Sequence, residues 1–134
     1  MNGVAAVVQL LGADATLIAL VPVTRIAAGV LTQDTTLPAI TVASISTVDR
    51  NINSPGATRF VSERVEVKGY ASSYPAQKVL LAAIKAAVAD KTPTVSGISN
   101  VTVHTDGAGP DFMNEMANIY IGSLDFRVKY TETR

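Results

Sequence analysis

The chain has 134 residues and a mass of 14.0 kDa, a length that predicts one domain spanning residues 1–134. Its 11 basic and 11 acidic residues balance, so the sequence as a whole lacks the attraction that non-specific nucleic-acid or anionic-membrane binding requires. The absence of cysteine excludes disulfides, thiolate nucleophiles and cysteine-ligated metals. Charged residues make up 16%, against about 25% in an average soluble domain, which we interpret as a hint of buried subunit contacts.

The N-terminal segment predicts two helices. Apolar residues recur with helical period at Val4, Val7, Val8 and Leu11. Gly12 is the residue type expected just past the end of this helix. Asp14 can cap a second short helix over 15–21, which Pro22 ends. Because no basic stretch precedes the apolar run, and the run is short and interrupted, we expect neither a signal peptide nor a membrane span.

Strand periodicity follows over residues 24–31 and 37–48. Apolar side chains fall on both faces of the second segment, which predicts an inner strand covered on both sides. Residues 49–58 are rich in Asn, Ser, Pro and Gly, and they predict a long, mobile tip between two strands.

A third strand is predicted over residues 59–71, with two unlike faces. One face carries the apolar residues Val61, Val65 and Val67, and the other carries Ser62, Arg64, Glu66 and Lys68. The apolar face should join the core, while the charged face either meets water or pairs across an interface. Glu63 and Glu66 fall on opposite faces, and we interpret both as solvated charges rather than an acid/base pair.

The strongest helix signal covers residues 75–90. A serine just before it can accept a first-turn N–H, and Pro75 lies where no donor is needed. The predicted apolar stripe consists of Val79, Leu80, Ala83, Ile84, Ala87 and Val88, with Gln77, Lys78, Lys85 and Asp90 facing out. This helix should pack across the sheet.

Two strands end the chain, over 98–105 and 117–131, separated by a glycine-rich loop over 106–116. The last strand changes parity between Ile121 and Leu124, and a β-bulge near Gly122 would return both halves to one face. The predicted fold class is therefore α+β: a mostly antiparallel sheet with helices packed on one face, in the order α-α-β-β-β-α-β-β.

Candidate chemistry is sparse. His104 is the only histidine, and Asp106 lies two residues on, on the same side of a strand, so a His–Asp pair of a hydrolytic triad is conceivable. The alternative, which we favour, is a surface histidine at a strand end. No metal-ligand spacing or phosphate-binding motif occurs, so we expect no catalytic, metal or cofactor site. In the 106–116 loop, Phe112, Met113 and Met116 either fold back over the core or insert into a neighbouring subunit.

The chain nevertheless resembles a known family. The resemblance is carried by the order of six segments: 14–21 (DATLIALV), 25–26 (RI), 37–42 (LPAITV), 64–74 (RVEVKGYASSY), the 79–88 helix and 123–130 (SLDFRVKY). In this order they are similar to the small tail-completion proteins of long-tailed bacteriophages, relatives of the tail terminator. The resemblance spans nearly the whole chain.

This resemblance implies a non-enzymatic virion protein, assembled in the host cytoplasm, that forms a homo-oligomeric ring, usually a hexamer. The ring would cap the head-proximal end of the tail tube, stop tube polymerisation and meet the head connector. DNA would pass through its lumen without specific binding, and no membrane is involved. Interface positions expected on the loops and the charged strand are Arg50, Asn51, Asn53, Arg64, Glu66, Lys68, Phe112, Met113 and Met116.

Three alternatives stay open. The chain could be another ring protein of the neck or head–tail connector. It could instead be a small-molecule-binding regulatory module with a pocket between helix and sheet, which convergent polar groups in an apolar cavity would reveal. An enzyme built on His104 is the third.

Overall fold

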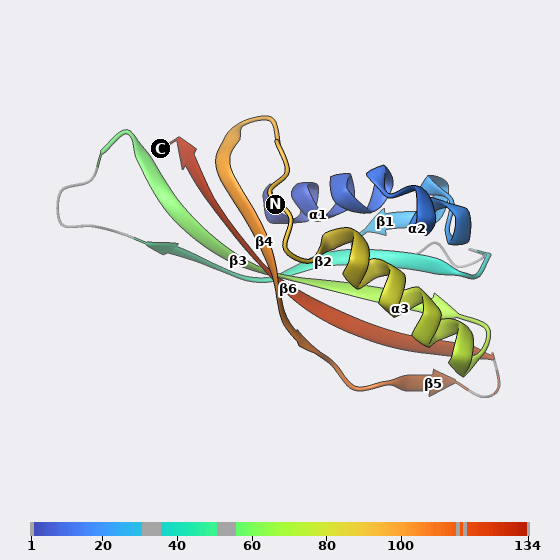
Figure 1. Ribbon diagram of the computed structural model, residues 1–134. Helices are drawn as coiled ribbons and strands as arrows, with labels where there is room; N and C mark the ends of the chain where they lie inside the picture. The colour runs from blue at the N-terminus through green and yellow to red at the C-terminus, as the bar shows by residue number, and fades with distance from the viewer. Residues whose placement is uncertain (1, 31–35, 51–55, 115, 117, 134) are drawn as a thin grey trace.

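The computed structural model describes residues 2–30, 36–50, 56–114, 116 and 118–133. Three helices lie on one face of a β-sheet (Figure 1). They are α1 (Asn2–Ala13), α2 (Ala15–Leu20) and α3 (Tyr74–Val88), and a 3-10 turn, η1 (Val23–Arg25), follows α2. The helix-covered face of the sheet is therefore the core face, and the opposite face, here called the open face, carries no helix in the described part of the chain.

The sheet has the strand order β1-β2-β3-β6-β4, with β5 pairing with β6 beyond the end of β4. Its strands are β1 (Ile26–Ala28), β2 (Ala39–Arg50), β3 (Thr58–Ala71), β4 (Ile98–Ala108), β5 (Phe112–Asn114) and β6 (Ile119–Thr133). β1 runs parallel to β2, and every other pairing is antiparallel. The predicted α+β class with a mostly antiparallel sheet is confirmed.

The core forms where the helices cover the central strands. Its fully buried members include Val65 and Phe126 from the sheet and Val7, Leu11 and Ile84 from the helices. The predicted apolar face of β3 is confirmed, because Val61, Val65 and Val67 all join this cluster.

The start of α3 matches the prediction, but its buried stripe does not. The Ser73 hydroxyl accepts a hydrogen bond from the Ala76 N–H at 3.3 Å, with Pro75 in the first turn. Val79, expected in the core, is 58% exposed, and Gln77, expected outside, is fully buried. The reason lies on β6, where Gly122 has no side chain: a Cβ there would stand 3.1 Å from Gln77 Cδ. Compared with the prediction, the buried side of α3 is therefore turned so that it includes Gln77 and leaves Val79 exposed.

The two N-terminal helices form, but α1 continues to Ala13, so the expectation that Gly12 lies past its end is wrong. The Asp14 carboxylate accepts a hydrogen bond from the Leu17 N–H at 2.9 Å and so caps α2. Glu63, expected as a solvated charge, is fully buried on the core face of β3. It accepts hydrogen bonds from the Gly3 N–H at 3.1 Å and the Tyr130 hydroxyl at 3.0 Å. The expectation is wrong for Glu63 because its parity places it among the core residues, where the start of α1 and Tyr130 supply donors.

Three strand predictions are also wrong in part. The expected strand over 24–31 is only η1 followed by the short β1. The expected loop over 106–116 is mostly strand, since β4 continues to Ala108 and β5 adds a further strand to the predicted order. β6 carries no bulge against β3, because their register is unbroken from Ala71–Tyr120 to Thr58–Thr133. Ile119 and Ile121 instead face the opposite side from the core, and β5 pairs beside them.

β2 has two halves with different surroundings. The inner strand predicted over 37–48 is confirmed only for residues 39–42, which are buried between β1 and β3, and the prediction is wrong for its second half. From Ser44 onward every residue of β2 is exposed, and the register with β3 shifts between Ser44 and Ser46. Together with the start of β3, this half forms an arm that extends away from the helices (Figure 1). Residues 51–55, which make up most of the predicted mobile tip, lie outside the described residues.

Candidate interaction surfaces

The open face of the sheet carries a network of paired charges. Arg64 of β3 donates from Nε to Asp125 Oδ2 of β6 at 3.2 Å, with a second, shorter contact from Nη2. Asp106 of β4 lies 3.6 Å from Arg64 Nε and accepts a hydrogen bond from Arg127 Nη2 at 3.0 Å. Glu66 and Lys68 form a further pair at 3.6 Å. Asp125 raises the pKa of Arg64, first through the hydrogen bond and then through its charge.

This network explains how an uncovered face can bury polar groups. Thr41, Ser62, Ser123 and Asp125 are nearly inaccessible although no helix lies over them in the described structure. The long Arg64 and Arg127 side chains lie across the sheet, and Arg127 Nη1 donates to the Ser62 hydroxyl at 3.4 Å. Thr41 and the Tyr70 hydroxyl are also within hydrogen-bond distance, at 3.3 Å.

A second surface is apolar and lies at β5; we call it the β5 patch. It consists of Phe112, Met113 and Met116, which are 57%, 58% and 99% exposed. Of the two alternatives for these side chains, folding back over the core is therefore wrong. Phe112 and Met113 are successive residues of β5 and point to opposite faces, so the patch extends around both sides of this strand. An isolated surface of this kind is typical of a contact with another protein.

Polar contacts fix the β5 patch against α3. Asp111, next to Phe112, accepts hydrogen bonds from Lys78 Nζ at 3.0 Å and the Tyr74 hydroxyl at 2.8 Å. The Lys78 and Tyr74 hydrogen bonds lower the pKa of Asp111, and the Asp111 hydrogen bond raises that of Lys78. Lys78 Nζ also lies 5.0 Å from the centre of the Tyr74 ring. The loop before β5 is thus held to the flank of α3 that faces away from α2.

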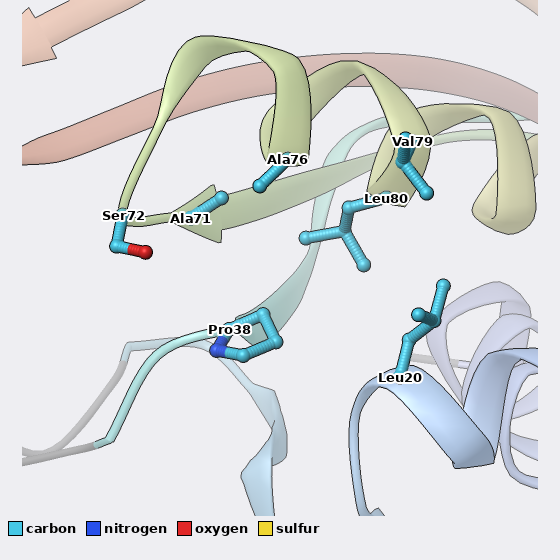
Figure 2. A pocket seen from close by; sticks show the side chains of 7 residues that line it. All are labelled: Leu20, Pro38, Ala71, Ser72, Ala76, Val79 and Leu80. Carbon is cyan, nitrogen blue, oxygen red and sulfur yellow. The ribbon is translucent and has the colours of Figure 1, made fainter.

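The opposite flank of α3 borders an apolar pocket of about 320 Å³, which we call the α2–α3 pocket. Figure 2 shows the seven side chains that line it: Leu20, Pro38, Ala71, Ser72, Ala76, Val79 and Leu80. None is charged, and Ser72 is the one polar residue among them. Leu20 and Val79 remain substantially exposed at its rim. The pocket lacks the convergent polar groups of a small-molecule site, so its lining favours an apolar side chain as occupant.

His104 and Asp106 do not form the conceivable catalytic pair. His104 is exposed, and its Nδ1 lies 2.8 Å from Asp90 Oδ1 rather than near Asp106. Asp106 is instead held by Arg127 and Arg64. The arrangement offers no oriented histidine beside a nucleophile, and the favoured interpretation of a surface histidine agrees with it.

The most perturbed ionisable group lies in the core rather than in a cleft. Burial, and then the hydrogen bond to Glu63, raise the pKa of Tyr130 far above that of an ordinary tyrosine. Together with the contact from Gly3, this pair joins β3, β6 and the start of α1. Its position among core residues indicates a structural role.

The predicted interface residues separate into groups. Arg50, Arg64, Glu66 and Lys68 lie on the open face by their β2–β3 register, and the three residues of the β5 patch lie together at one end of the sheet. Asn51 and Asn53 lie outside the described residues. The sequence did not single out Asp125 or the α2–α3 pocket, and it indicated Asp106 only as a conceivable partner of His104. Asp125 and Arg127 share one face of β6 by strand alternation, but only the tertiary structure shows which charges they meet.

No cluster of three or more histidine, aspartate or glutamate residues suited to a metal ion occurs among the residues that the structure describes. No helix within that same part of the chain is both long and apolar enough to cross a bilayer.

The fold is that of a small α+β protein with an ion-paired open face, an exposed apolar patch at β5 and an apolar pocket beside α3. The family model described as Tail completion protein gp17 matches residues 5–131, so the chain belongs to this tail-completion family. It is a structural protein of the phage tail and virion, and the resemblance stated from the sequence is confirmed.

A comparison of structures agrees with this assignment. The fold is similar to that of a chain in the structure titled "Virion of native gene transfer agent (GTA) particle", with a TM-score of 0.73 and 21% identity. The alignment covers 95% of this chain and 92% of that one. A comparison with curated proteins gives no match.

Proposed function

We propose that the chain folds as one domain over residues 1–134 and assembles into a ring, most simply a hexamer. The ring caps the head-proximal end of the phage tail tube, stops its polymerisation and joins the tail to the head. Membership of the tail-completion family supports the tail location. The single observation that carries the ring is the pair of unlike apolar surfaces, the β5 patch and the α2–α3 pocket, on opposite flanks of α3.

A closed ring of identical subunits needs a pair of unlike surfaces such as the β5 patch and the α2–α3 pocket. Each subunit must offer two different surfaces, because in a head-to-tail contact one surface meets the other on the next copy. Figure 1 shows α3 between α2 and β5, so the two surfaces lie on opposite sides of the same helix. The patch carries large uncharged side chains, and the pocket has an uncharged lining and room for one or two of them. In the proposed ring, Phe112 of the β5 patch of one copy enters the α2–α3 pocket of the next.

The remaining predicted interface residues serve the other partners in this proposal. Arg64, Glu66 and Lys68 of the open face, together with Asn51 and Asn53, which follow β2 in the sequence, contact the tail tube protein or the head–tail connector protein. The protein acts by binding geometry and not by catalysis: it matches the tube on one face and denies the next tube ring a site on the other. Assembly takes place in the host cytoplasm, and DNA passes through the lumen.

Two reciprocal variants test the ring. Phe112→Asp places a charge on the patch, and Val79→Asp places one at the rim of the pocket; both side chains are more than half exposed, so the monomers should stay folded. Native mass spectrometry, with tube protein present if the free chain is monomeric, should show rings for the unaltered protein and none for either variant.

A mixture of the two variants sharpens the test. Each variant keeps one intact surface, so together they should form dimers but no ring. Phe60→Asp, an equally disruptive change at an exposed phenylalanine of the arm, is the matched control and should leave the ring intact. Rings formed by Phe112→Asp would refute this contact, and normal tails with heads attached after removal of the gene from the parent phage would refute the function.

A further inference from the structure

At the end nearer the arm, the open face also carries a group of cations with fewer carboxylates beside them than are needed to balance their charge. A shallow groove of about 400 Å³ there is lined by residues of four strands: Arg50, Ser62, His104, Thr105, Asp106, Arg127 and Lys129. The groove therefore contains three permanent cations and one carboxylate, with His104 beside them. The zero net charge of the whole chain conceals this local excess.

Ion pairing divides the open face into two parts. In the central part, Arg64 meets Asp125 and Lys68 meets Glu66. In the groove, the one carboxylate, Asp106, is already engaged by Arg127 and Arg64. Within the described residues, Arg50 and Lys129 have no ion-pair partner, although both reach the same groove. An anion entering the groove would meet two unpaired cations.

The sheet register sets these cations across the strands. Lys129 of β6 pairs with Ser62 of β3, and Arg127, two residues before Lys129 on β6, pairs with His104 of β4. Arg50 reaches the same groove from β2. These cations lie on β2 and β6, which are two strand spacings apart, so they are separated by about 10 Å across the sheet. Cations spread over this width can contact more than one phosphate, so they fit an extended polyanion better than a single small anion.

We propose that this groove binds the phosphate backbone of double-stranded DNA without reading sequence. The chain is a structural protein of a phage tail and virion, and duplex DNA is the extended polyanion of that setting. The groove offers charge complementarity with only Asp106 opposing it, and its floor is the buried Ser62. This inference uses the tail assignment but does not depend on ring formation.

Fluorescence anisotropy with a labelled 20-base-pair duplex of mixed sequence tests the inference. The unaltered protein should bind it, and the Arg50→Gln, Lys129→Gln double variant should lose about tenfold in affinity at about 50 mM salt. Removing two phosphate contacts should also lower the slope of log affinity against log salt by about 1.8. The matched control is Lys68→Gln with Lys85→Gln, which changes the net charge equally but leaves the groove intact. Circular dichroism and native mass spectrometry should show equal folding and oligomeric state.

Four results would overturn the proposal. One is the absence of duplex binding by the unaltered protein. Another is an equal loss of affinity in the two double variants, which would mean that only net charge matters. The third is tighter binding of a poly-glutamate peptide than of the duplex, which would identify an acidic protein as the occupant. Inorganic phosphate at matched ionic strength should not displace the duplex; displacement would show a site for a single phosphate instead.

Discussion

The two faces of the sheet are made by alternate residues of the same strands, yet they are stabilised in different ways. On the core face, β3 and β6 place Val65, Val67 and Phe126 under the helices. On the open face the same strands carry Arg64, Glu66, Asp125 and Arg127, which are buried partly by one another. The core face is thus stabilised by apolar burial, which is insensitive to salt, and the open face by charge pairing, which salt weakens. Changes on the core face should therefore alter stability, and changes on the open face should alter binding.

The largest effect should come from the core face. Ile84→Ala removes a fully buried side chain between α3 and the sheet and should lower the free energy of unfolding by about 2–5 kcal/mol, measured by urea denaturation. Val79→Ala on the same helix is the control, and it should change that free energy by less than about 0.5 kcal/mol because Val79 is mostly exposed. Equal effects of the two changes would contradict the orientation of α3.

A smaller loss of stability is expected when the hydrogen bond between Tyr130 and Glu63 in the core is removed. Tyr130→Phe removes the hydroxyl that donates to the buried Glu63 and should cost about 1–3 kcal/mol in urea unfolding at neutral pH. Tyr70→Phe, which removes the hydroxyl near Thr41 on the open face, should cost less. A Tyr70→Phe variant that is less stable than Tyr130→Phe would contradict this expectation.

Tyr130 should also give the fold a measurable dependence on alkaline pH. Because its pKa is raised in the folded state, its contribution is complete below the unfolded pKa of about 10. Above that pH the unfolded chain loses the proton while the folded chain keeps it, so stability falls as pH rises. Urea denaturation between about pH 9 and pH 11 should show a steeper decline for the unaltered protein than for Tyr130→Phe. Equally steep declines of stability in the two proteins would contradict the raised pKa of Tyr130.

The smallest effect on stability is expected from a change at His104 of β4. His104→Gln removes an exposed pair with Asp90, and exposed pairs of this kind contribute little. The free energy of unfolding should change by less than about 0.5 kcal/mol, and ring assembly should be unaltered. A larger destabilisation would show that this pair supports β4, and loss of a measurable activity at equal folding would revive the enzyme hypothesis.

Sequence patterns predicted most of the helices and strands because local rules govern them. The cap at Asp14, the serine and proline before α3, and the alternation of β3 are all confirmed. The same patterns predicted the charged face of β3 as a separate surface and singled out Phe112, Met113 and Met116. They did not predict the α2–α3 pocket, because its lining comes from three parts of the chain that are separated in sequence: Leu20, Pro38 and residues 71–80.

The residues whose burial or secondary structure was predicted wrongly share one cause. The polarity of a residue does not indicate which other residues will contact it in the fold. Gln77 is buried because Gly122 leaves space beneath it, and Glu63 is buried because donors from α1 and β6 reach it. Residues 106–108 look like a glycine-rich loop, yet they form strand because β6 continues alongside and pairs with them. In each case a partner far away in the sequence supplies the hydrogen bonds or the space.

By itself, the sequence determined the α+β class, the order of the main elements and the division of β3 into an apolar and a charged face. These follow from periodicity and capping, which act over a few residues. Only the tertiary structure decided which charges pair and where the pocket lies relative to the β5 patch. Among the residues that the structure describes, this pairing leaves Arg50 and Lys129 without an ion-pair partner. Those features depend on strand register and helix placement, and they are set by contacts between residues that lie far apart along the chain.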